Sequence, residues 1–432
     1  MELVDTQDSG SCAFGCGGST PLVRTTLFIL PVLYSKMLKL IRNDPLIRRL
    51  SLVQFISYFG SWFSNVAIYT LILQFGVDPF TNALVVSMYA LPAFLAPLNG
   101  AIVDKFEFKR FMLILLFIEL SMTLAYLFIH DISQVTLLMF FIFIRTTASL
   151  LFFNAEMSML PQLFSGEKLK NVNQLHSVIW SITYALGMAI GGIAVDRIGI
   201  YNTILIDAVL FCIAIYLFHS IKFYIRKKTT QNIHTLIREG FQYLKKHKLL
   251  LHLIFLHSAV AFTSFDALIN LLTDMRYKYI IAIPLAIGWL NGTRALGLMV
   301  GPLVIGKIVK TKNLHLFFIG QGIIILLWSL TEHNFYLSLC MMFLVGFFTT
   351  TLWSYTYTLV QTHTEPEYLG RVVAYNDMIF MVGSIIVTLF TGAAFKAGIS
   401  LEIITAILGI GFILSGFYFH WFQKSYHYFL KQ

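Results

Sequence analysis

The sequence predicts an all-α integral membrane protein whose twelve transmembrane helices form two pseudo-symmetric six-helix bundles. Composition is the first reason: 57% of the residues are hydrophobic and only 12% are charged, whereas a soluble chain of 432 residues needs far more charge. The mean hydropathy is +0.76. The second reason is that apolar runs of roughly twenty residues, the length that crosses a bilayer, recur along the chain. The third is one long polar interval that divides these runs six and six.

The predicted helices follow the apolar runs, each of which ends at a short polar or charged cluster. In the N-terminal bundle, residues 37–222, we expect helices at 50–75, 82–103, 110–130, 134–163, 171–196 and 200–222. In the C-terminal bundle, residues 250–432, we expect helices at 250–274, 283–308, 313–331, 335–362, 370–396 and 400–422. The interval 223–249 between the bundles is the longest polar stretch. We expect a basic cytoplasmic loop there, because it carries Arg226, Lys227, Lys228, Arg238, Lys245, Lys246 and Lys248.

The distribution of charge orients the chain in the membrane. The net charge of +10 does not indicate a nucleic-acid partner, because the basic residues lie in short loops between apolar runs. Basic loops concentrate on the cytoplasmic side of membrane proteins. Besides the central interval, one side holds Arg48, Arg49, Lys105, Lys109, Arg110, Lys168, Lys170, Lys307, Lys310, Lys312 and Arg371, and the other chiefly Arg197, Arg276, Lys278 and Lys396. We therefore expect an inner-membrane protein with both termini and the central loop in the cytoplasm.

A charged cluster joins the second and third predicted helices. Its residues follow the pattern G-x-x-x-D-K-x-x-x-K-R, with Gly100, Asp104, Lys105, Lys109 and Arg110 at the fixed positions. So short a connection makes the two helices antiparallel neighbours, and a glycine lets membrane helices approach closely. A positively charged cytoplasmic turn of any membrane protein would explain the basic residues alone. The full spacing resembles the motif between helices two and three of the major facilitator superfamily, although Phe108 stands where that family usually has a glycine.

An internal repeat extends the resemblance to most of residues 37–432. Glu167, Leu169, Val172, Gly192 and Ala194 recur 200 residues later as Glu367, Leu369, Val372, Gly392 and Ala394. Gly100 has a plausible partner in Gly306, but Lys310 replaces the acid in the second half. Six helices repeated in one orientation match the two halves of a major facilitator. Residues 159–211 and the run Glu-Tyr-Leu-Gly-Arg-Val at 367–372 are most similar to the enterobactin and macrolide exporter branch.

The resemblance implies a secondary transporter that works by alternating access of its two halves. We expect proton-coupled export of a drug-like, siderophore-like or other amphiphilic metabolite. Uptake by symport or facilitated diffusion is the alternative within this fold, and a non-transporting sensor or membrane enzyme is the alternative from another class. No phosphate-binding, dinucleotide-binding or zinc-protease fingerprint occurs in the sequence, so we expect no enzymatic activity and no cofactor. The expected partners are a small-molecule substrate, protons and the lipid bilayer, and the expected state is a monomer.

Ionisable residues inside the apolar helices are the candidates for proton coupling, because they are costly there unless they have a function. Asp266 is the preferred proton carrier, Glu156 is the second choice, and Arg145 and Asp207 are further candidates. Arg145 and Glu156 lie on nearly one face of the fourth helix, and an arginine at such a place belongs to a family motif associated with proton coupling. Alternatively, Arg145 forms an interhelical pair with Glu119, and Asp207 is structural.

Polar and aromatic residues on the helices that line the central cavity in the family are candidates for substrate contact. They are Gln54, Ser61, Asn65, Asn270, Arg294, Trp353, Tyr357 and Gln361. The resemblance also assigns a conformational gate to Gly100, Asp104, Lys105, Lys109, Arg110 and Arg371, with Asp104 facing the start of the eleventh helix. His176 and His257 are single histidines, which we expect to be packed and satisfied in the helix bundle.

Residues 1–36 are unlike the rest of the chain, and we interpret them as spurious or disordered. They lack the basic start and apolar core of a signal peptide, and they back-translate readily into a leucine tRNA gene. Met37 would then be the start, followed by a short basic segment. The alternative is a metal or lipid site at Cys12 and Cys16.

A chain that begins at Met37 should therefore insert and transport as well as the full chain. Expression level and transport in membrane vesicles measure this directly. Loss of either on removal of residues 1–36 would contradict the interpretation.

Overall fold

The computed structural model describes residues 39–96, 98, 106–223, 233–306, 308–365 and 367–425. Within them the all-helical membrane fold is confirmed, and ten helices are long and apolar enough to cross a membrane. The first bundle contains α2 (Pro45–Gln74), α3 (Pro79–Ser87) with the 3-10 turn η1 (Leu91–Leu95), α5 (Phe108–Ala125), α6 (Val135–Leu163), α7 (Gly166–Ile198) and α8 (Ile200–Ser220). The predicted span 82–103 corresponds to the shorter apolar segment Pro79–Leu95 in its described part. Residues 1–36, Gly100, Asp104 and Lys105 lie outside the described residues.

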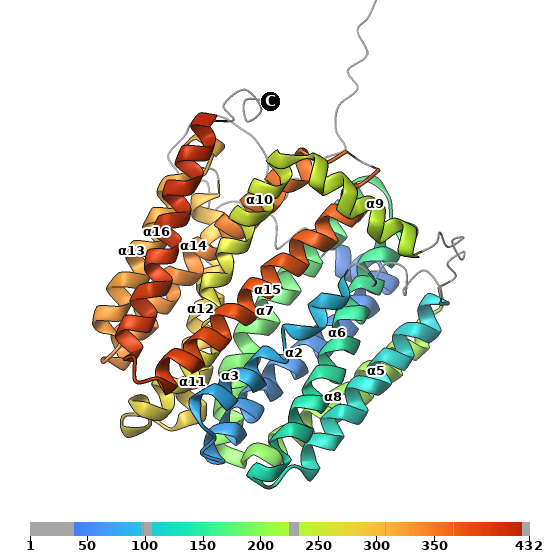
Figure 1. Cartoon of the computed structure of the whole chain (residues 1–432). Helices are drawn as coiled ribbons and strands as arrows, with labels where there is room; N and C mark the ends of the chain where they lie inside the picture. Colours follow the sequence, from blue (N-terminus) through green and yellow to red (C-terminus); the bar gives the residue numbers. More distant parts are fainter. Residues whose placement is uncertain are drawn as a thin grey trace, which may run out of the picture.

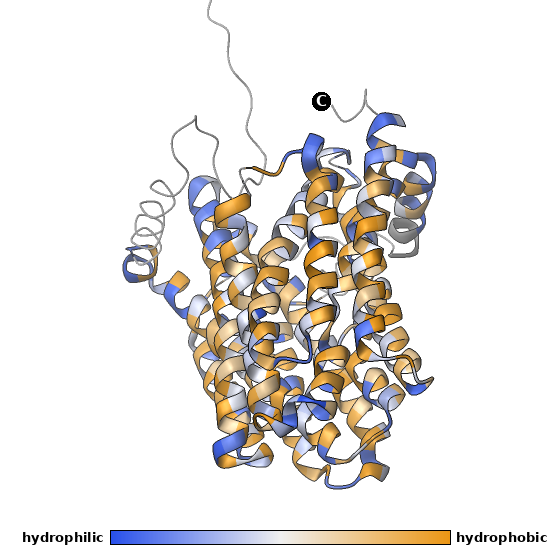
Figure 2. Cartoon of the chain, turned by 90° about the vertical axis from the view of Figure 1, so that its left-hand side faces the viewer, coloured by the Kyte–Doolittle hydropathy of each residue, from blue (hydrophilic) through white to orange (hydrophobic). Residues whose placement is uncertain are grey.

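The second bundle contains α10 (Lys248–Ser258), η4 (Ala259–Thr263), α11 (Asp266–Met275), α12 (Ile283–Ile305), α13 (Leu314–Thr331), α14 (Phe335–Thr362), α15 (Leu369–Lys396) and α16 (Leu401–Ser425). These helices run side by side (Figure 1). Hydrophilic residues gather at the two ends, and hydrophobic residues cover the length between them (Figure 2). That pattern is the one expected of a bundle that spans a bilayer.

Part of the predicted central loop is helical. α9 (Ile233–Lys246) lies across one end of the bundle (Figure 1). Its Tyr243 ring stacks on Tyr368 with centroids 4.2 Å apart, and Glu239 Oε2 lies 3.1 Å from Arg371 Nη1. α9 is therefore attached to the start of α15.

The seventh predicted span, 250–274, is not the continuous helix that the sequence suggested. α10 passes through the turn η4, and a new helix, α11, begins at Asp266. Arg294 Nη2 donates a hydrogen bond of 2.6 Å to the carbonyl oxygen of Thr263, so the break has an internal partner for its freed backbone. The break places Asp266 at the first turn of a helix instead of in the middle of one.

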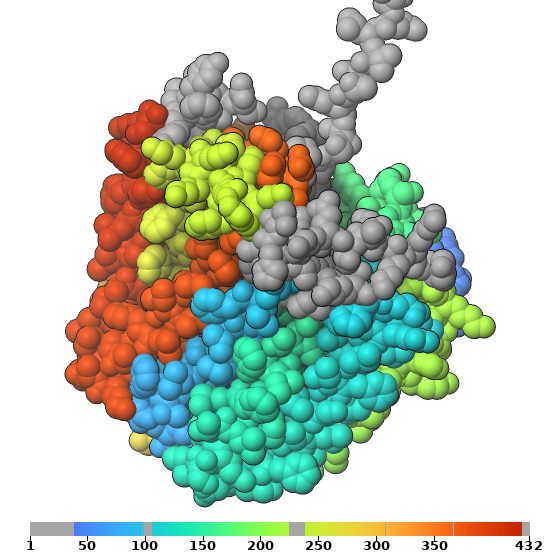
Figure 3. Space-filling model, turned by 45° about the vertical axis from the view of Figure 1, so that its right-hand side comes forward, coloured from blue at the N-terminus to red at the C-terminus, as the bar shows by residue number. Residues whose placement is uncertain are grey.

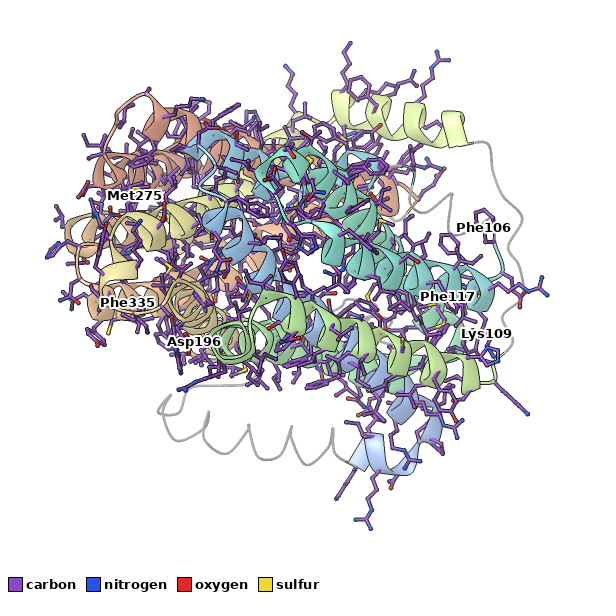
Figure 4. All side chains as sticks on the ribbon, turned by 90° about the horizontal axis from the view of Figure 1, so that it is seen from below. Phe106, Lys109, Phe117, Asp196, Met275 and Phe335 are labelled. Carbon is purple, nitrogen blue, oxygen red and sulfur yellow. The ribbon has the colours of Figure 1, made fainter. Side chains whose placement is uncertain are left out.

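The two halves pack side by side. In the view from below, Phe106 and Lys109 lie at one edge of the molecule, and Met275 and Phe335 lie at the opposite edge (Figure 4). In the first half α2 packs against α7 and α8, and in the second α12 packs against α14 while α13 packs against α16. Between the halves α7 contacts α12, and α3 contacts α15, which lies beside it in Figure 3. One buried apolar cluster combines residues of both halves, including Val66 and Ala83 with Ala267 and Ile287.

The halves approach most closely near one end, which we call the Asp78 end. A Cβ on Gly192 of α7 would lie 2.6 Å from the carbonyl oxygen of Pro284, and one on Gly392 of α15 would lie 2.6 Å from that of Pro79. Glycine is required at both places because any side chain would separate the helices. Lys396 Nζ also reaches across to Asp78 Oδ1 at 2.9 Å. Hydrogen bonds from the Thr81 hydroxyl and from Lys396 lower the pKa of Asp78 to about 2.

Glu332 ties three helices together at this end. Its side chain is fully buried, lies 3.2 Å from Arg276 Nη1, and accepts a 2.8 Å hydrogen bond from the Thr405 hydroxyl on α16. Arg276 follows α11 and also pairs with the more exposed Glu402. The buried carboxylate is thus the shared partner of the cluster.

Glu332→Ala should lower the free energy of unfolding by roughly 2–3 kcal/mol, because it leaves the partly buried Arg276 without its buried carboxylate partner. Glu402→Ala is the matched control, and we expect it to cost about 1 kcal/mol or less because that carboxylate is more exposed. Thermal unfolding of both variants in detergent measures the difference. Equal melting temperatures would contradict the assigned role of Glu332.

Candidate functional site

A buried ion pair crosses the first half between α6 and α8. Arg145 Nη2 lies 2.7 Å from Asp207 Oδ2, and the two residues are 5% and 0% exposed. Arg145 Nη1 also donates a 3.0 Å hydrogen bond to Ser64 on α2, and the guanidinium lies over the rings of Tyr126 and Phe211. The direct partner of Arg145 is thus Asp207 and not Glu119, the partner considered in the structural alternative.

Gly60 explains how Asp207 reaches this position. A Cβ on Gly60 would lie 2.3 Å from Asp207 Oδ1, so only glycine on α2 leaves room for the carboxylate. Ser61 Oγ lies 3.5 Å from Arg145 Nη2, which places this predicted substrate contact beside the ion pair. The pair therefore links α2, α6 and α8 at one point inside the bundle.

Asp266 lies at the seam between the halves. It is half-buried at the start of α11, and Arg294 of α12 is within electrostatic range. The hydroxyls of Tyr69 on α2, Tyr184 on α7 and Tyr89, just after α3, are within electrostatic range as well. All three tyrosines belong to the first half, and α11 itself packs against α2 and α3 of that half.

Aromatic side chains surround this seam. The Tyr69 and Tyr89 rings meet edge to face at 5.7 Å, and Trp62 packs on Tyr184 with centroids 4.3 Å apart. Tyr184 donates a 3.5 Å hydrogen bond to Asn291 of α12. These residues were not predicted from the sequence, because Phe, Tyr and Trp make up 15% of the chain and no single one of them stands out.

The predicted cavity residue Asn270 lies at the same seam. Asn270 Nδ2 donates a 3.1 Å hydrogen bond to Asn82 Oδ1, which joins α11 to α3 across the two halves. Asn65 is buried on α2. Asn270 is therefore engaged between the halves in this conformation.

A second cluster of ionisable groups lies within the first half. Glu156 Oε2 accepts a 3.2 Å hydrogen bond from the Tyr58 hydroxyl and lies 3.1 Å from His176 Nε2. The predicted cavity residue Gln54 donates to the backbone oxygen of His176 at 3.1 Å. His176 is thus satisfied, and its partner is an acid. A small cavity beside the cluster is lined by Ile47, Leu50, Ser51, Gln54, Glu156, Leu160, Phe164, Val172 and His176.

A third cluster lies in the second half. Trp353 and Tyr357 stack on α14 with centroids 4.9 Å apart, while the predicted Gln361 lies half-buried one turn further. The centroid of the His257 ring, on α10, lies 5.5 Å from that of Trp353 and 5.6 Å from that of Tyr357. Asp377 on α15 is within electrostatic range of Tyr357. Asp377 was not among the residues predicted from the sequence, although it is, like Asp266, an acid inside an apolar run.

The described part of the predicted gate motif bonds within its own surroundings. Lys109 Nζ donates a 2.7 Å hydrogen bond to the backbone oxygen of Ile221, and Arg110 pairs with Glu107 at the surface. Arg371 contacts Glu239 of α9, which the sequence did not suggest. The predicted contact of Asp104 with the start of α15 involves a residue outside the described ones. Among the described residues, no three His, Cys, Asp or Glu side chains gather as a metal site.

Comparison with known proteins agrees with this architecture. A family model described as the Major Facilitator Superfamily matches residues 50–388. Two proteins of Bacillus subtilis (strain 168), both described as uncharacterized MFS-type transporters, are similar: YkuC is 25% identical over 363 residues, covering 77% of this chain and 81% of YkuC. YfiS is 27% identical over 220 residues, covering 49% of this chain and 52% of YfiS.

Among solved structures, the nucleoside transporter NupG has the same fold. It superimposes with a TM-score of 0.67 at 14% sequence identity, covering 87% of this chain and 98% of NupG. At that identity the likeness concerns the fold and not the substrate. The family match over most of the chain, on a membrane-spanning helical fold, shows that this protein belongs to the major facilitator superfamily and is a membrane transporter, not an enzyme.

Proposed function

We propose that this transporter uses the proton gradient to export a drug-like, siderophore-like or other amphiphilic organic solute. The observation that carries the proposal is the position of Asp266 at the start of α11, which packs against α2 and α3 of the other half and against α12, with Arg294 within electrostatic range. Removal of water favours the neutral form of a carboxyl, and a nearby cation favours the charged form. When the halves move, both influences on Asp266 change together, so the movement can load and release a proton.

The orientation of the cycle follows from charge. We infer that the Asp78 end faces the outside and that α9 and both termini face the cytoplasm, because the basic loops lie at the α9 end. The glycine contacts and the Lys396–Asp78 ion pair hold the Asp78 end together. We therefore assign the conformation described here to the state that exchanges solute with the cytoplasm. The monomer in the inner membrane is the functional unit of this proposal.

The remaining ionisable groups have supporting roles in the proposal. In this proposal the Arg145–Asp207 pair, which also binds Ser64 of α2, is the link that carries movements of α2 to α6 and α8. Glu156, with His176, is a second place for a proton inside the first half. Aromatic rings at the seam suit an amphiphilic solute, because they offer apolar area together with a few hydroxyls.

Substrate-induced proton release in inside-out membrane vesicles tests the function and its direction. Antibiotics, dyes and iron chelators that inhibit growth of a deletion strain supply the candidate solutes. A vesicle lumen acidified by respiration should lose protons when an exported solute is added outside. If no solute releases protons, while right-side-out vesicles take up protons together with a solute, the protein is a symporting importer and the export proposal is wrong.

Asp266→Asn should abolish accumulation of solute against its gradient while leaving downhill exchange intact, because an amide cannot carry the proton. Asp274→Asn is the matched control eight residues later in α11, where the acid pairs with the half-exposed Lys278. Uphill and downhill fluxes in proteoliposomes, at several pH values, separate the two activities. Uphill transport with an unchanged pH profile in Asp266→Asn would make this residue structural and transfer the role to Glu156.

Asp207→Asn should destabilise the protein by roughly 3–5 kcal/mol, because it leaves the buried Arg145 charge without its partner. The double variant Arg145→Met/Asp207→Leu removes both charges, and we expect it to recover most of that stability. Thermal unfolding in detergent measures both. If the pair takes part in coupling, the stable double variant should exchange solute downhill without uphill accumulation. Full proton-driven accumulation in the double variant would leave the pair a purely structural role.

A further inference from the structure

The two halves carry related polar clusters at the repeat distance of 200 residues. Glu156 and His176 of the first half correspond to Thr356 and Asn376 of the second. Tyr58 corresponds to Ser258, which follows His257. In the first half the cluster satisfies itself, since Glu156 binds both Tyr58 and His176. In the second half, by contrast, two buried side-chain atoms of the cluster have no hydrogen-bond partner among the described residues.

His257 is fully buried and uses only one of its ring nitrogens. Its Nδ1 lies 2.8 Å from the Thr356 hydroxyl oxygen, and that hydroxyl donates its own hydrogen to the Leu352 carbonyl at 2.8 Å. Nδ1 therefore carries the ring hydrogen, an assignment made from the hydrogen-bond network, and Nε2 is left as a bare acceptor. Nε2 is buried and has no hydrogen-bond partner among the described residues.

Asn376 on α15 likewise has one side-chain group bonded and one left without a partner among the described residues. Its Nδ2 donates to Asp377 Oδ1 at 3.4 Å, while its Oδ1 is buried without a partner among the residues that the structure describes. Phe380, one turn along α15, contacts the His257 ring at 5.6 Å, so α15 presents this segment to the histidine. The polar groups without partners here are acceptors, and Asp377 adds a carboxylate. Buried acceptors of this kind call for a ligand that donates.

Two aromatic rings of α14, those of Trp353 and Tyr357, pack beside His257. The stacked rings of Trp353 and Tyr357 are inclined by only 24°, and Trp353 is 37% exposed. Both contact His257, and Asp377 is within electrostatic range of Tyr357. Indole and phenol faces attract cations and stack on planar rings. His257 thus packs against both Trp353 and Tyr357 of α14 and against Phe380, one turn along α15 from Asn376 and Asp377.

We propose that these five residues, His257, Trp353, Tyr357, Asn376 and Asp377, form a subsite for a protonated amino group attached to a planar aromatic ring. The N–H groups of an ammonium satisfy His257 Nε2 and Asn376 Oδ1, the Asp377 carboxylate balances its charge, and the ring lies on Trp353 and Tyr357. We call this subsite the His257 site. It narrows the substrate class of the proposed function from amphiphilic solutes to aromatic amines. Binding at the site does not depend on the proposed function, but the role of the site in transport rests on it.

Equilibrium binding to the purified full chain in lipid nanodiscs tests the site without any gradient. Calorimetry with 2-phenylethylammonium and with its N,N,N-trimethyl counterpart compares two probes of equal charge and equal ring, of which only the first has N–H donors. We expect saturable binding of the ammonium, about tenfold tighter than that of the quaternary probe, as hydrogen bonds to charged groups imply. Equal affinities, or no saturable binding of the ammonium, would overturn the proposal.

Two variants locate the effect. His257→Phe keeps a ring but removes the acceptor, so it should abolish the preference for the ammonium, whereas Asp377→Asn should weaken both probes about tenfold. Asp196→Asn, at the Asp78 end beside Arg197, is the control and should bind both probes as the unaltered chain does. An unchanged preference in a folded His257→Phe protein places the probe elsewhere. Failure of proton-driven export would leave these binding results valid, so the two proposals fail separately.

Discussion

The interior of a membrane offers no water to a polar group, and this constraint governs how the whole chain is arranged. Helices satisfy their own backbone hydrogen bonds, so what remains is to find partners for the side chains and for interrupted helices such as the one that passes from α10 through η4 to α11. Arg145 has Asp207, and the carbonyl freed at the end of η4 has Arg294. Because each partner comes from another helix, the polar groups fix which helices lie together, while the apolar surface alone would permit many arrangements.

Hydropathy was enough to predict most of the membrane helices, because a membrane demands long apolar runs, and ten described helices are long and apolar enough to cross one. The charge pattern and the 200-residue repeat led to the correct family for a similar reason, since both are regular along the sequence. Partners could not be predicted in the same way. The Arg145–Asp207 pair depends on the space left by Gly60 of a third helix, and the break before Asp266 depends on a backbone partner from α12. Asp377 was predictable in principle, because it is an acid within an apolar run.

The two halves share one fold but differ in how their buried polar side chains are paired. In the first half the acid and histidine on α6 and α7 face each other, which gives a closed and self-sufficient cluster. In the second half the equivalent positions hold threonine and asparagine, and a histidine, His257, lies instead on α10, where one of its nitrogens has no partner among the described residues. A duplicated architecture can thus keep one copy for stability or protons and leave the other open to a ligand, as a symmetric pair could not.

The ion pair between Lys396 and Asp78 has a consequence for the environment in which the protein works. A carboxyl with a pKa of about 2 stays charged at any pH that a cell meets, so acidity does not loosen this contact. Dissolved salt does, because the pair lies at the surface and the screening length shrinks from about 10 Å at 0.1 M to about 3 Å at 1 M. The balance between the two ends of the bundle is therefore tuned by the salinity of the surrounding medium, independently of the proton gradient.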